Sequence, residues 1–158
     1  MKAAFLNPFV EAVFSVVPQV LSVTPKRGEL SLRHAKTFTS EDVNAVVGVR
    51  GEVQGVAVYG FSKETALTIV STMTGSPYTE FDDMSRSAIN ELANMITGNA
   101  ATLLSNAGYK CDISPPSLVQ GTGIQVTTLA PALLVPFETE LGPIQLNVAL
   151  VETAAKAA

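Results

Sequence analysis

The apolar residues of this chain recur with two different periods, which separate predicted helices from predicted strands. Over residues 7–17 they recur every three or four positions, the spacing of an α-helix with one apolar face. Asn7 is a suitable N-cap, Pro8 suits the first helical position, and Pro18 is expected to end or kink the helix. This segment is therefore predicted to bury one broad face in a core.

Two further helices are predicted in the middle of the chain. Ser62 is a suitable N-cap for a short helix that ends before Gly75. Residues 82–108 form a long helical pattern that begins with two aspartates, which suit the positive end of a helix dipole. Its expected apolar face consists of Met84, Ile89, Leu92, Met95, Ile96, Leu103 and Leu104.

Aliphatic runs separated by turn residues predict two β-hairpins. The first joins residues 43–50 to residues 53–61 near Gly51. The second joins residues 133–138 to residues 144–151 through the turn Leu141-Gly142-Pro143. The other segments are predicted as strand and loop over residues 19–38, loop over residues 111–122 and a short strand over residues 123–129.

The order of these elements predicts an α/β (α+β) fold with a mostly antiparallel sheet and helices packed on one side. A chain of 158 residues has the length of one ordinary domain. We expect that domain to span residues 1–152, and the tail over residues 153–158 to fray because it has little to bury.

One face of the long predicted helix carries the candidate chemistry. Ser87, Glu91, Asn94 and Gly98 stand at i, i+4, i+7 and i+11. A carboxylate can pair with a cation, and a carboxamide can donate and accept hydrogen bonds to position a water molecule. These residues are either a docking stripe or the ordinary polar face of an amphipathic helix. Gly98 either bends the helix and aids packing or clears room for a partner.

The two halves of the chain resemble each other, since each has a helix followed by strands that end in a glycine-marked hairpin. The first helix places Asn7, Glu11 and Phe14 at the spacing of the docking stripe, with the aromatic ring where the stripe has its amide. This pattern suggests an internal duplication in which one copy retains a competent site.

The sparse charge of the chain bears on its partners. Charged residues make up 15% of the sequence against 47% hydrophobic residues, which favours a buried subunit interface. The net charge of −4 disfavours nucleic acid as a partner. The basic residues between 26 and 36 are interpreted as a solvated face.

Other classes of protein are disfavoured by residue type. Cys111 is the only cysteine and His34 the only histidine, which argues against a disulfide and a zinc site and fits a reducing cytoplasm. The uncharged stretch over residues 113–137 contains prolines and glycines that exclude a membrane helix. Polar residues interrupt the N-terminal apolar run, so we expect no signal peptide.

The docking stripe resembles the motif of the CheC/CheX/FliY chemotaxis phosphatases. That motif is Asp or Ser, Glu four positions later, Asn three positions after the Glu, and a proline further on. Ser87, Glu91 and Asn94 match it in type and spacing, and Pro116 lies one residue short of the family's spacing from the Asn. The layout of helices and hairpins fits over nearly the whole chain. A single intact motif is more like CheX than CheC.

This resemblance implies a pseudo-twofold fold with two long motif helices side by side. It also implies hydrolysis of the aspartyl phosphate of a CheY-type receiver domain, in which Asn94 orients the attacking water and Glu91 pairs with a lysine of the receiver. Ser87, Gly98 and Pro116 would then contact the receiver. The family implies no cofactor of the chain's own, Mg²⁺ supplied by the bound receiver and a homodimer.

Other functions stay open on the residues alone. A catalytically silent docking module would bind a receiver or another signalling partner without accelerating hydrolysis. An assembly protein would use the same helix face as an interface. A metalloenzyme is the least favoured alternative, because the chain has few metal-binding residue types.

Overall fold

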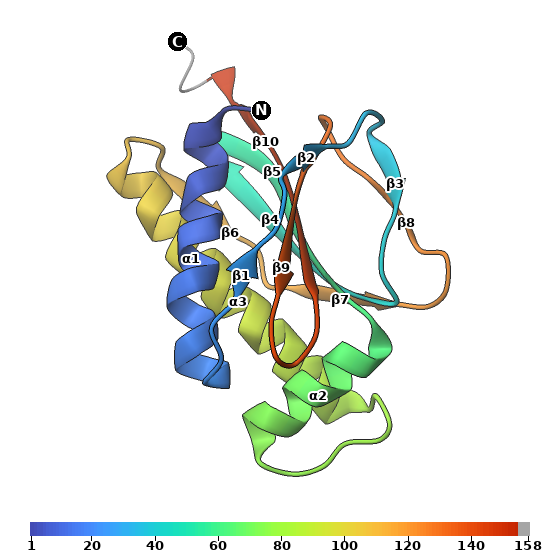
Figure 1. The fold of residues 1–158 in the computed structure, drawn as a ribbon. Helices are drawn as coiled ribbons and strands as arrows, with labels where there is room; N and C mark the ends of the chain where they lie inside the picture. Colours follow the sequence, from blue (N-terminus) through green and yellow to red (C-terminus); the bar gives the residue numbers. More distant parts are fainter. Residues whose placement is uncertain (155–158) are drawn as a thin grey trace.

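The computed structural model describes residues 1–154, in which helices cover one face of an antiparallel sheet (Figure 1). The helices are α1 (Ala3–Leu21), α2 (Lys63–Thr74) and α3 (Asp83–Asn106). The strands are β1 (Lys26–Arg27), β2 (Ser31–Leu32), β3 (Thr37–Thr39), β4 (Val43–Gly51), β5 (Val53–Phe61), β6 (Cys111–Ile113), β7 (Ser117–Gln120), β8 (Gln125–Thr127), β9 (Leu133–Glu138) and β10 (Ile144–Glu152).

The main sheet has eight strands, and both predicted hairpins, β4–β5 and β9–β10, are confirmed. Its order is β1-β9-β10-β5-β4-β6, with β2 also paired to β9 and β7 also paired to β4. The long strands β10, β5 and β4 lie at the centre of this order, where Val58 pairs with Val46 on one side and Asn147 on the other. Strands β3 and β8 form a separate two-stranded ribbon.

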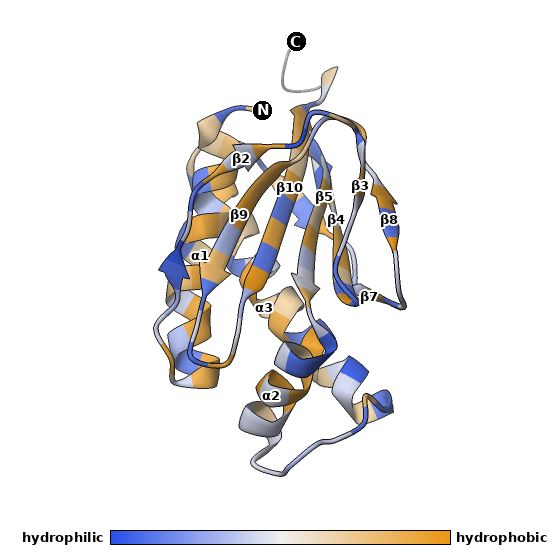
Figure 2. Ribbon diagram, turned by 45° about the vertical axis from the view of Figure 1, so that its right-hand side comes forward, coloured by the Kyte–Doolittle hydropathy of each residue, from blue (hydrophilic) through white to orange (hydrophobic). Residues whose placement is uncertain are grey.

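The helical face of the sheet forms the main core. Alternate side chains of the central strands point toward α1 and α3, as the period of a β-strand requires. Figure 2 shows the resulting alternation of hydrophobic and hydrophilic positions along β10. The opposite face is partly covered by the β3–β8 ribbon, where Phe38, Ala132 and Ala149 form a small second cluster. The predicted arrangement, with helices on one side of the sheet, is confirmed.

The predicted caps of α2 and the predicted start of α3 are confirmed. The Ser62 hydroxyl accepts a hydrogen bond from the Thr65 N–H at 3.1 Å, and Gly75 ends α2 at φ 72°. At α3, the Asp82 carboxylate accepts from the Ser85 N–H at 2.9 Å, and the Ser85 hydroxyl accepts from the Asp82 N–H. The hydrogen bonds from Ser85 lower the pKa of Asp82. Together these bonds fix where α3 begins.

The predicted ends of the first helix are wrong. α1 begins before Asn7, which makes no cap, and it continues through Pro18 to Leu21. Phe5, Leu6 and Leu21 are each 2% exposed or less. Burying these apolar side chains outweighs the helical hydrogen bond that each internal proline removes.

The predicted loop over residues 111–122 is also wrong, because it contains β6 and β7, both paired to β4. The break between the two strands is Ser114-Pro115-Pro116. Prolines have no N–H to donate to a strand ladder, so this sequence resembles a loop, but the edge of a sheet tolerates such a break. Ser114 bridges it, because its N–H donates to the Gly48 carbonyl at 2.9 Å and its hydroxyl accepts from the Gly48 N–H at 2.8 Å.

The predicted apolar face of α3 needs one correction. Met84 is 57% exposed and Met95 is 38% exposed, so neither belongs to the core, and Leu103 is only half-buried. Small residues take part in the buried face and allow α3 to approach its neighbours closely. The buried residues of that face include Ala88, Ile89, Leu92, Ala93, Ile96, Ala100 and Leu104.

α1 has the length and apolar composition of a membrane-spanning helix, but half of its most apolar stretch is buried inside the fold. It lies beside α3 (Figure 1), which confirms the prediction of two long helices side by side. Its apolar side chains are therefore used in the core. Of the tail predicted to fray, residues 155–158 lie outside the described residues.

A buried hydrogen bond joins α3 to the sheet. The hydroxyl oxygens of Tyr59 on β5 and Thr97 on α3 are 2.8 Å apart, and both residues are fully buried. The Thr97 hydroxyl donates to the Ala93 carbonyl at 2.7 Å, so Tyr59 is the donor to Thr97. Burial raises the pKa of Tyr59 and keeps that donor protonated.

We expect Tyr59→Phe to lower the free energy of unfolding by about 1 kcal/mol, because it removes this hydrogen bond and leaves the ring in place. Urea unfolding measures the change, with an unaltered slope if the fold is kept. Tyr78→Phe is the matched control, since the half-buried Tyr78 makes no hydroxyl hydrogen bond within residues 1–154. Equal midpoints for the two variants would contradict this role of Tyr59.

Candidate functional site

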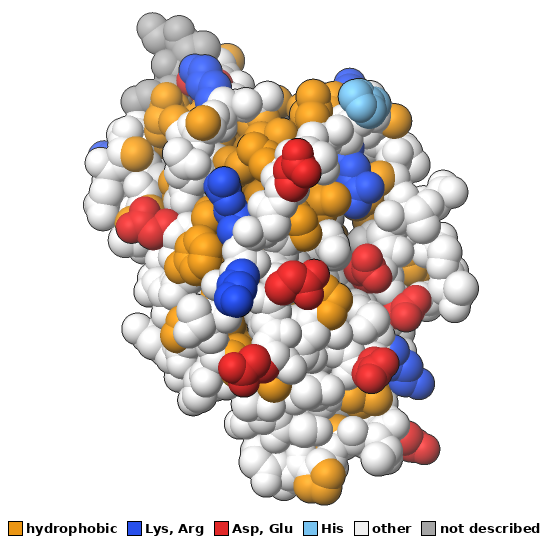
Figure 3. All heavy atoms as spheres, in the orientation of Figure 1, with side chains coloured by type: hydrophobic (Ala, Val, Ile, Leu, Met, Phe, Trp, Pro, Cys, Tyr) orange, Lys and Arg blue, Asp and Glu red, His pale blue; other side chains and the backbone are white. Residues whose placement is uncertain are grey.

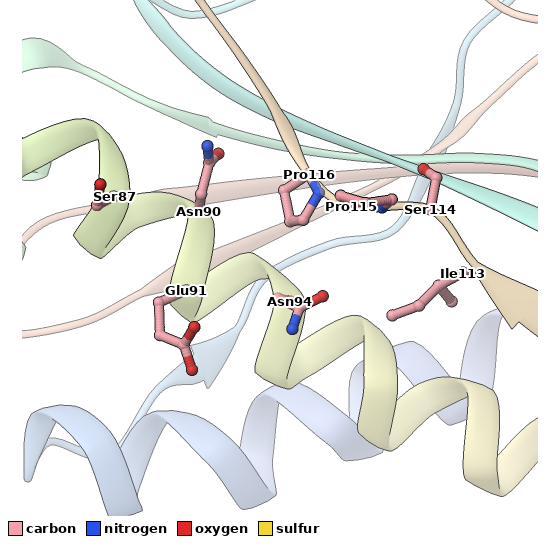
Figure 4. Close-up of a pocket in the computed structure, with 8 residues that line it drawn as sticks. All are labelled: Ser87, Asn90, Glu91, Asn94, Ile113, Ser114, Pro115 and Pro116. Carbon is pink, nitrogen blue, oxygen red and sulfur yellow. The ribbon is translucent and has the colours of Figure 1, made fainter. Parts of the chain in front are cut away.

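An open depression of about 540 Å³ lies between α3 and the segment that joins β6 to β7 (Figure 4). We call it the α3 depression. One wall comes from α3, and the other comes from the end of β6 and the double proline. Its lining residues are Ser87, Asn90, Glu91, Asn94, Ile113, Ser114, Pro115 and Pro116.

The helical period of α3 places the polar wall. Residues on its inner face are buried in the core, so Ser87, Glu91 and Asn94 are turned outward and are exposed. Within residues 1–154 their side chains make no hydrogen bond and no ion pair. Other polar side chains of α3 behave differently, since Thr97 and Thr102 both donate to carbonyls of the helix. The docking stripe is thus free to engage another molecule.

The proline wall is held rigidly but offers few hydrogen bonds. Ser114 fixes the wall to β4 through its two bonds to Gly48. A Cβ at Gly48 would lie 3.0 Å from the Ser114 hydroxyl oxygen, so glycine permits this close approach. Pro115 and Pro116 have no N–H groups. Hydrogen bonding in the α3 depression therefore comes mainly from the helix.

The structure brings together four of the five residues predicted for the site. Ser87, Glu91, Asn94 and Pro116 all line the α3 depression, whereas Gly98 lies one turn further along α3 and outside its lining. α1, which carries Asn7, Glu11 and Phe14 at the same spacing, lies beside α3.

Sequence reasoning missed several residues of the lining. Asn90 stands four positions before Asn94, so helical spacing and its low helix propensity were available signals. Ile113 and Ser114 carried no such signal, because their place in the lining depends on the pairing of β6 with β4.

The stripe on α1 differs from that on α3 at the decisive position. Asn7 and Glu11 are exposed, but Phe14 stands where α3 has its amide. The ring of Phe14 is 41% exposed and packs edge-on against Phe137 at 5.7 Å between centroids. An aromatic ring supplies no carboxamide, so this copy of the stripe lacks the amide that α3 carries at Asn94.

The α3 depression contains no strong nucleophile of its own. Cys111 is half-buried outside the lining, and its burial together with the charge of Asp112 raises the pKa of its thiol. No group of three or more His, Cys, Asp or Glu side chains within residues 1–154 is placed to hold a metal ion. The groups available for chemistry are a carboxylate, two carboxamides and hydroxyls.

Comparison with known protein families shows to which family this chain belongs. The model of the family described as chemotaxis phosphatase CheX matches residues 43–138, a range that includes α3 and the proline wall. The chain belongs to this CheX family. A curated relative from Thermotoga maritima, named CheY-P phosphatase CheX, is 35% identical over 138 residues and covers 86% of this chain and 88% of its own length.

Solved structures of the CheX and CheC-like type confirm the predicted fold. The CheX of Desulfovibrio desulfuricans matches with a TM-score of 0.83 and 26% identity, over 94% of this chain and 99% of its own. A CheC-like superfamily protein from a Shewanella species matches with a TM-score of 0.85 and 25% identity, over 96% of this chain and 99% of its own. A chain of a CheX–CheY–BeF₃–Mg²⁺ complex from Borrelia burgdorferi matches with a TM-score of 0.77 and 30% identity, over 94% of this chain and 98% of its own.

We expect Gly98→Ala to raise the free energy of unfolding by about 0.5–1 kcal/mol, the gain in helix propensity of alanine over glycine. A Cβ at this position meets only Ile113 Cδ1 at 4.0 Å, an ordinary contact, so packing does not require glycine. Urea unfolding measures the change.

Gly55→Ala is the opposite control, because its Cβ would overlap the Ala149 carbonyl and its φ is +148°. A loss of stability in Gly98→Ala would show that α3 needs glycine for its own packing, leaving no reason to assign Gly98 to a partner.

Proposed function

We propose that this chain hydrolyses the aspartyl phosphate of a phosphorylated CheY-type receiver domain, with Asn94 orienting the attacking water. The observation that carries this proposal is an exposed amide and carboxylate that make no bonds within the described fold and border an open depression. The name of the Thermotoga relative and the Borrelia complex with CheY support the choice of substrate.

The chemistry that we assign to Asn94 is positioning. The Asn94 amide oxygen accepts a hydrogen bond from the water and directs its oxygen at phosphorus. A bond forms between the water oxygen and phosphorus, while the bond from phosphorus to the aspartyl oxygen breaks. The aspartate is regenerated as a carboxylate, and inorganic phosphate leaves with the protons of the water. Phosphoryl transfer depends mainly on such positioning and on electrostatics, so an amide suffices where no strong base is present.

We assign a docking role to Glu91, one helical turn before Asn94. Its carboxylate is exposed and unpaired, as a group must be if it is to meet a cation on another protein. We propose that it pairs with a lysine of the receiver and thereby fixes the register in which α3 enters. A charged pair formed at an interface contributes to correct orientation as well as affinity.

We propose that Mg²⁺ enters the site with the receiver. The donor groups of the α3 depression support this, since among the described residues Glu91 is its only carboxylate and no His or Cys lines it. The Borrelia complex, which contains CheY, BeF₃ and Mg²⁺, is consistent with a metal ion that comes with the receiver. The metal would supply charge neutralisation at the phosphoryl group, and this chain would supply the amide.

We also propose that the chain forms a homodimer in the cytoplasm by pairing sheet edges. Charged residues are sparse, at 15% of the sequence. Figure 3 shows hydrophobic side chains gathered around β2, at an edge of the sheet. The exposed large apolar side chains there and nearby include Leu30 and Leu32. A second copy of the chain would cover such side chains.

We expect Asn94→Ala to lose about 100-fold or more of the acceleration of receiver dephosphorylation, because the attacking water is no longer held in line. Loss of phosphate from a phosphorylated CheY-type receiver measures the rate. Asn99→Ala, on the same helix but outside the α3 depression, is the matched control. A fully active Asn94→Ala would refute the water-positioning role, and wild-type binding without acceleration would identify a silent docking module.

We expect Glu91→Ala to weaken binding of the receiver by about tenfold, through loss of one charged pair at the interface. The melting temperature should stay within a few degrees of wild type, because Glu91 makes no bond within the described fold. Titration calorimetry with the receiver measures the affinity. Glu11→Ala removes the equivalent carboxylate of α1 and should leave affinity unchanged; equal effects of the two variants would contradict a specific role for Glu91.

A further inference from the structure

Among the described residues that line the α3 depression, Asn90 alone has an unsatisfied buried group. It lies on α3 one turn before Asn94 and is half-buried. Its amide oxygen Oδ1 is buried and has no hydrogen-bond partner among the described residues. Figure 4 shows the Asn90 side chain extending from α3 toward the segment that carries Pro116.

The backbone of the wall that faces Asn90 offers no free hydrogen-bond donor to this oxygen. Pro115 and Pro116 have no N–H groups. The N–H of Ser114 already donates to the Gly48 carbonyl at 2.9 Å, and the Ser114 hydroxyl accepts from the Gly48 N–H. The fold therefore places a carboxamide against a wall without free backbone donors.

An unpaired buried carbonyl destabilises the free protein, and an apolar side chain of the same shape would avoid that cost. Buried polar groups of this kind are uncommon in folded proteins and call for a specific explanation. Within the described chain, Asn147 and Thr153 also have unpaired buried atoms, but neither residue lines the α3 depression. Of the described residues, only Asn90 combines an unpaired amide with a place in this open depression.

We infer that Asn90 is a specificity-determining residue that binds the docked receiver, an inference that rests on the proposed function. When the receiver fills the α3 depression, a main-chain N–H or a hydroxyl of the receiver donates to the Asn90 amide oxygen. Rotation about χ2, which is broad for asparagine, turns that oxygen toward the opening. Asn90 lies one helical turn from Asn94, so it contributes to recognition of the receiver and leaves the attacking water to Asn94.

The test compares Asn90→Leu with Asn99→Leu. Both variants replace asparagine by leucine on α3, but Asn99 is exposed and lies outside the α3 depression. Affinity is measured by calorimetry with a CheY-type receiver loaded with Mg²⁺ and beryllium fluoride, so that binding is read without hydrolysis. Turnover is measured separately with the phosphorylated receiver at saturating concentration.

We expect Asn90→Leu to weaken receiver binding by about tenfold, or about 1.4 kcal/mol, with kcat at saturation unchanged. Its melting temperature should equal or exceed that of Asn99→Leu, because the unpaired carbonyl is gone. Asn99→Leu should bind like wild type. Weaker binding together with undiminished stability is a combination that a purely structural asparagine would not give.

Two results would overturn the assignment of Asn90: wild-type affinity in Asn90→Leu, or a melting temperature several degrees below that of Asn99→Leu. Failure of the proposed function has a different signature, in which the wild-type protein binds the loaded receiver but does not accelerate loss of phosphate. A wild-type protein that does not bind the receiver refutes both proposals.

Discussion

The packing of α3 against the sheet is the constraint on which the rest of the structure depends. Its inner face is buried through Leu92 and Ile96, and the hydrogen bond from Tyr59 to Thr97 joins it to the centre of the sheet. Because one face of α3 is buried in the core, the helical period fixes which residues lie on the opposite face. Glu91 and Asn94 must then face outward, so the same packing that stabilises the fold also presents the docking stripe.

The second wall of the site depends on the edge of the sheet. β4 pairs with β6 and then with β7, and the strand ladder is interrupted only at Ser114-Pro115-Pro116. The two hydrogen bonds between Ser114 and Gly48 hold this interruption in a fixed place. A wall of prolines is rigid and poor in hydrogen-bond donors. The hydrogen-bonding groups of the depression therefore come mainly from α3, and among them the Asn90 amide oxygen is buried without a partner.

Much of the fold was predictable from local pattern, because its signals act over a few residues. The aliphatic runs Val43–Gly51 and Val53–Phe61, the N-cap Ser62 and the first turn at Asp82 all specify local geometry, and the structure confirms them. The ends of α1 were not predictable in this way. Pro8 is a local signal for the start of a helix and Pro18 for its end, and the burial of Phe5 and Leu21 in the tertiary core overrides both.

The sequence alone determined the helical face that carries Ser87, Glu91 and Asn94, since a helix of fixed period places residues at such spacing together whatever surrounds them. Only the tertiary structure decided what faces that stripe. Pro116 and Ser114 reach it through pairing of β6 and β7 with β4, an interaction between segments far apart in the chain. The tertiary fold likewise decided which stretch of the α3 surface is buried, and Met84 and Met95 lie outside that stretch.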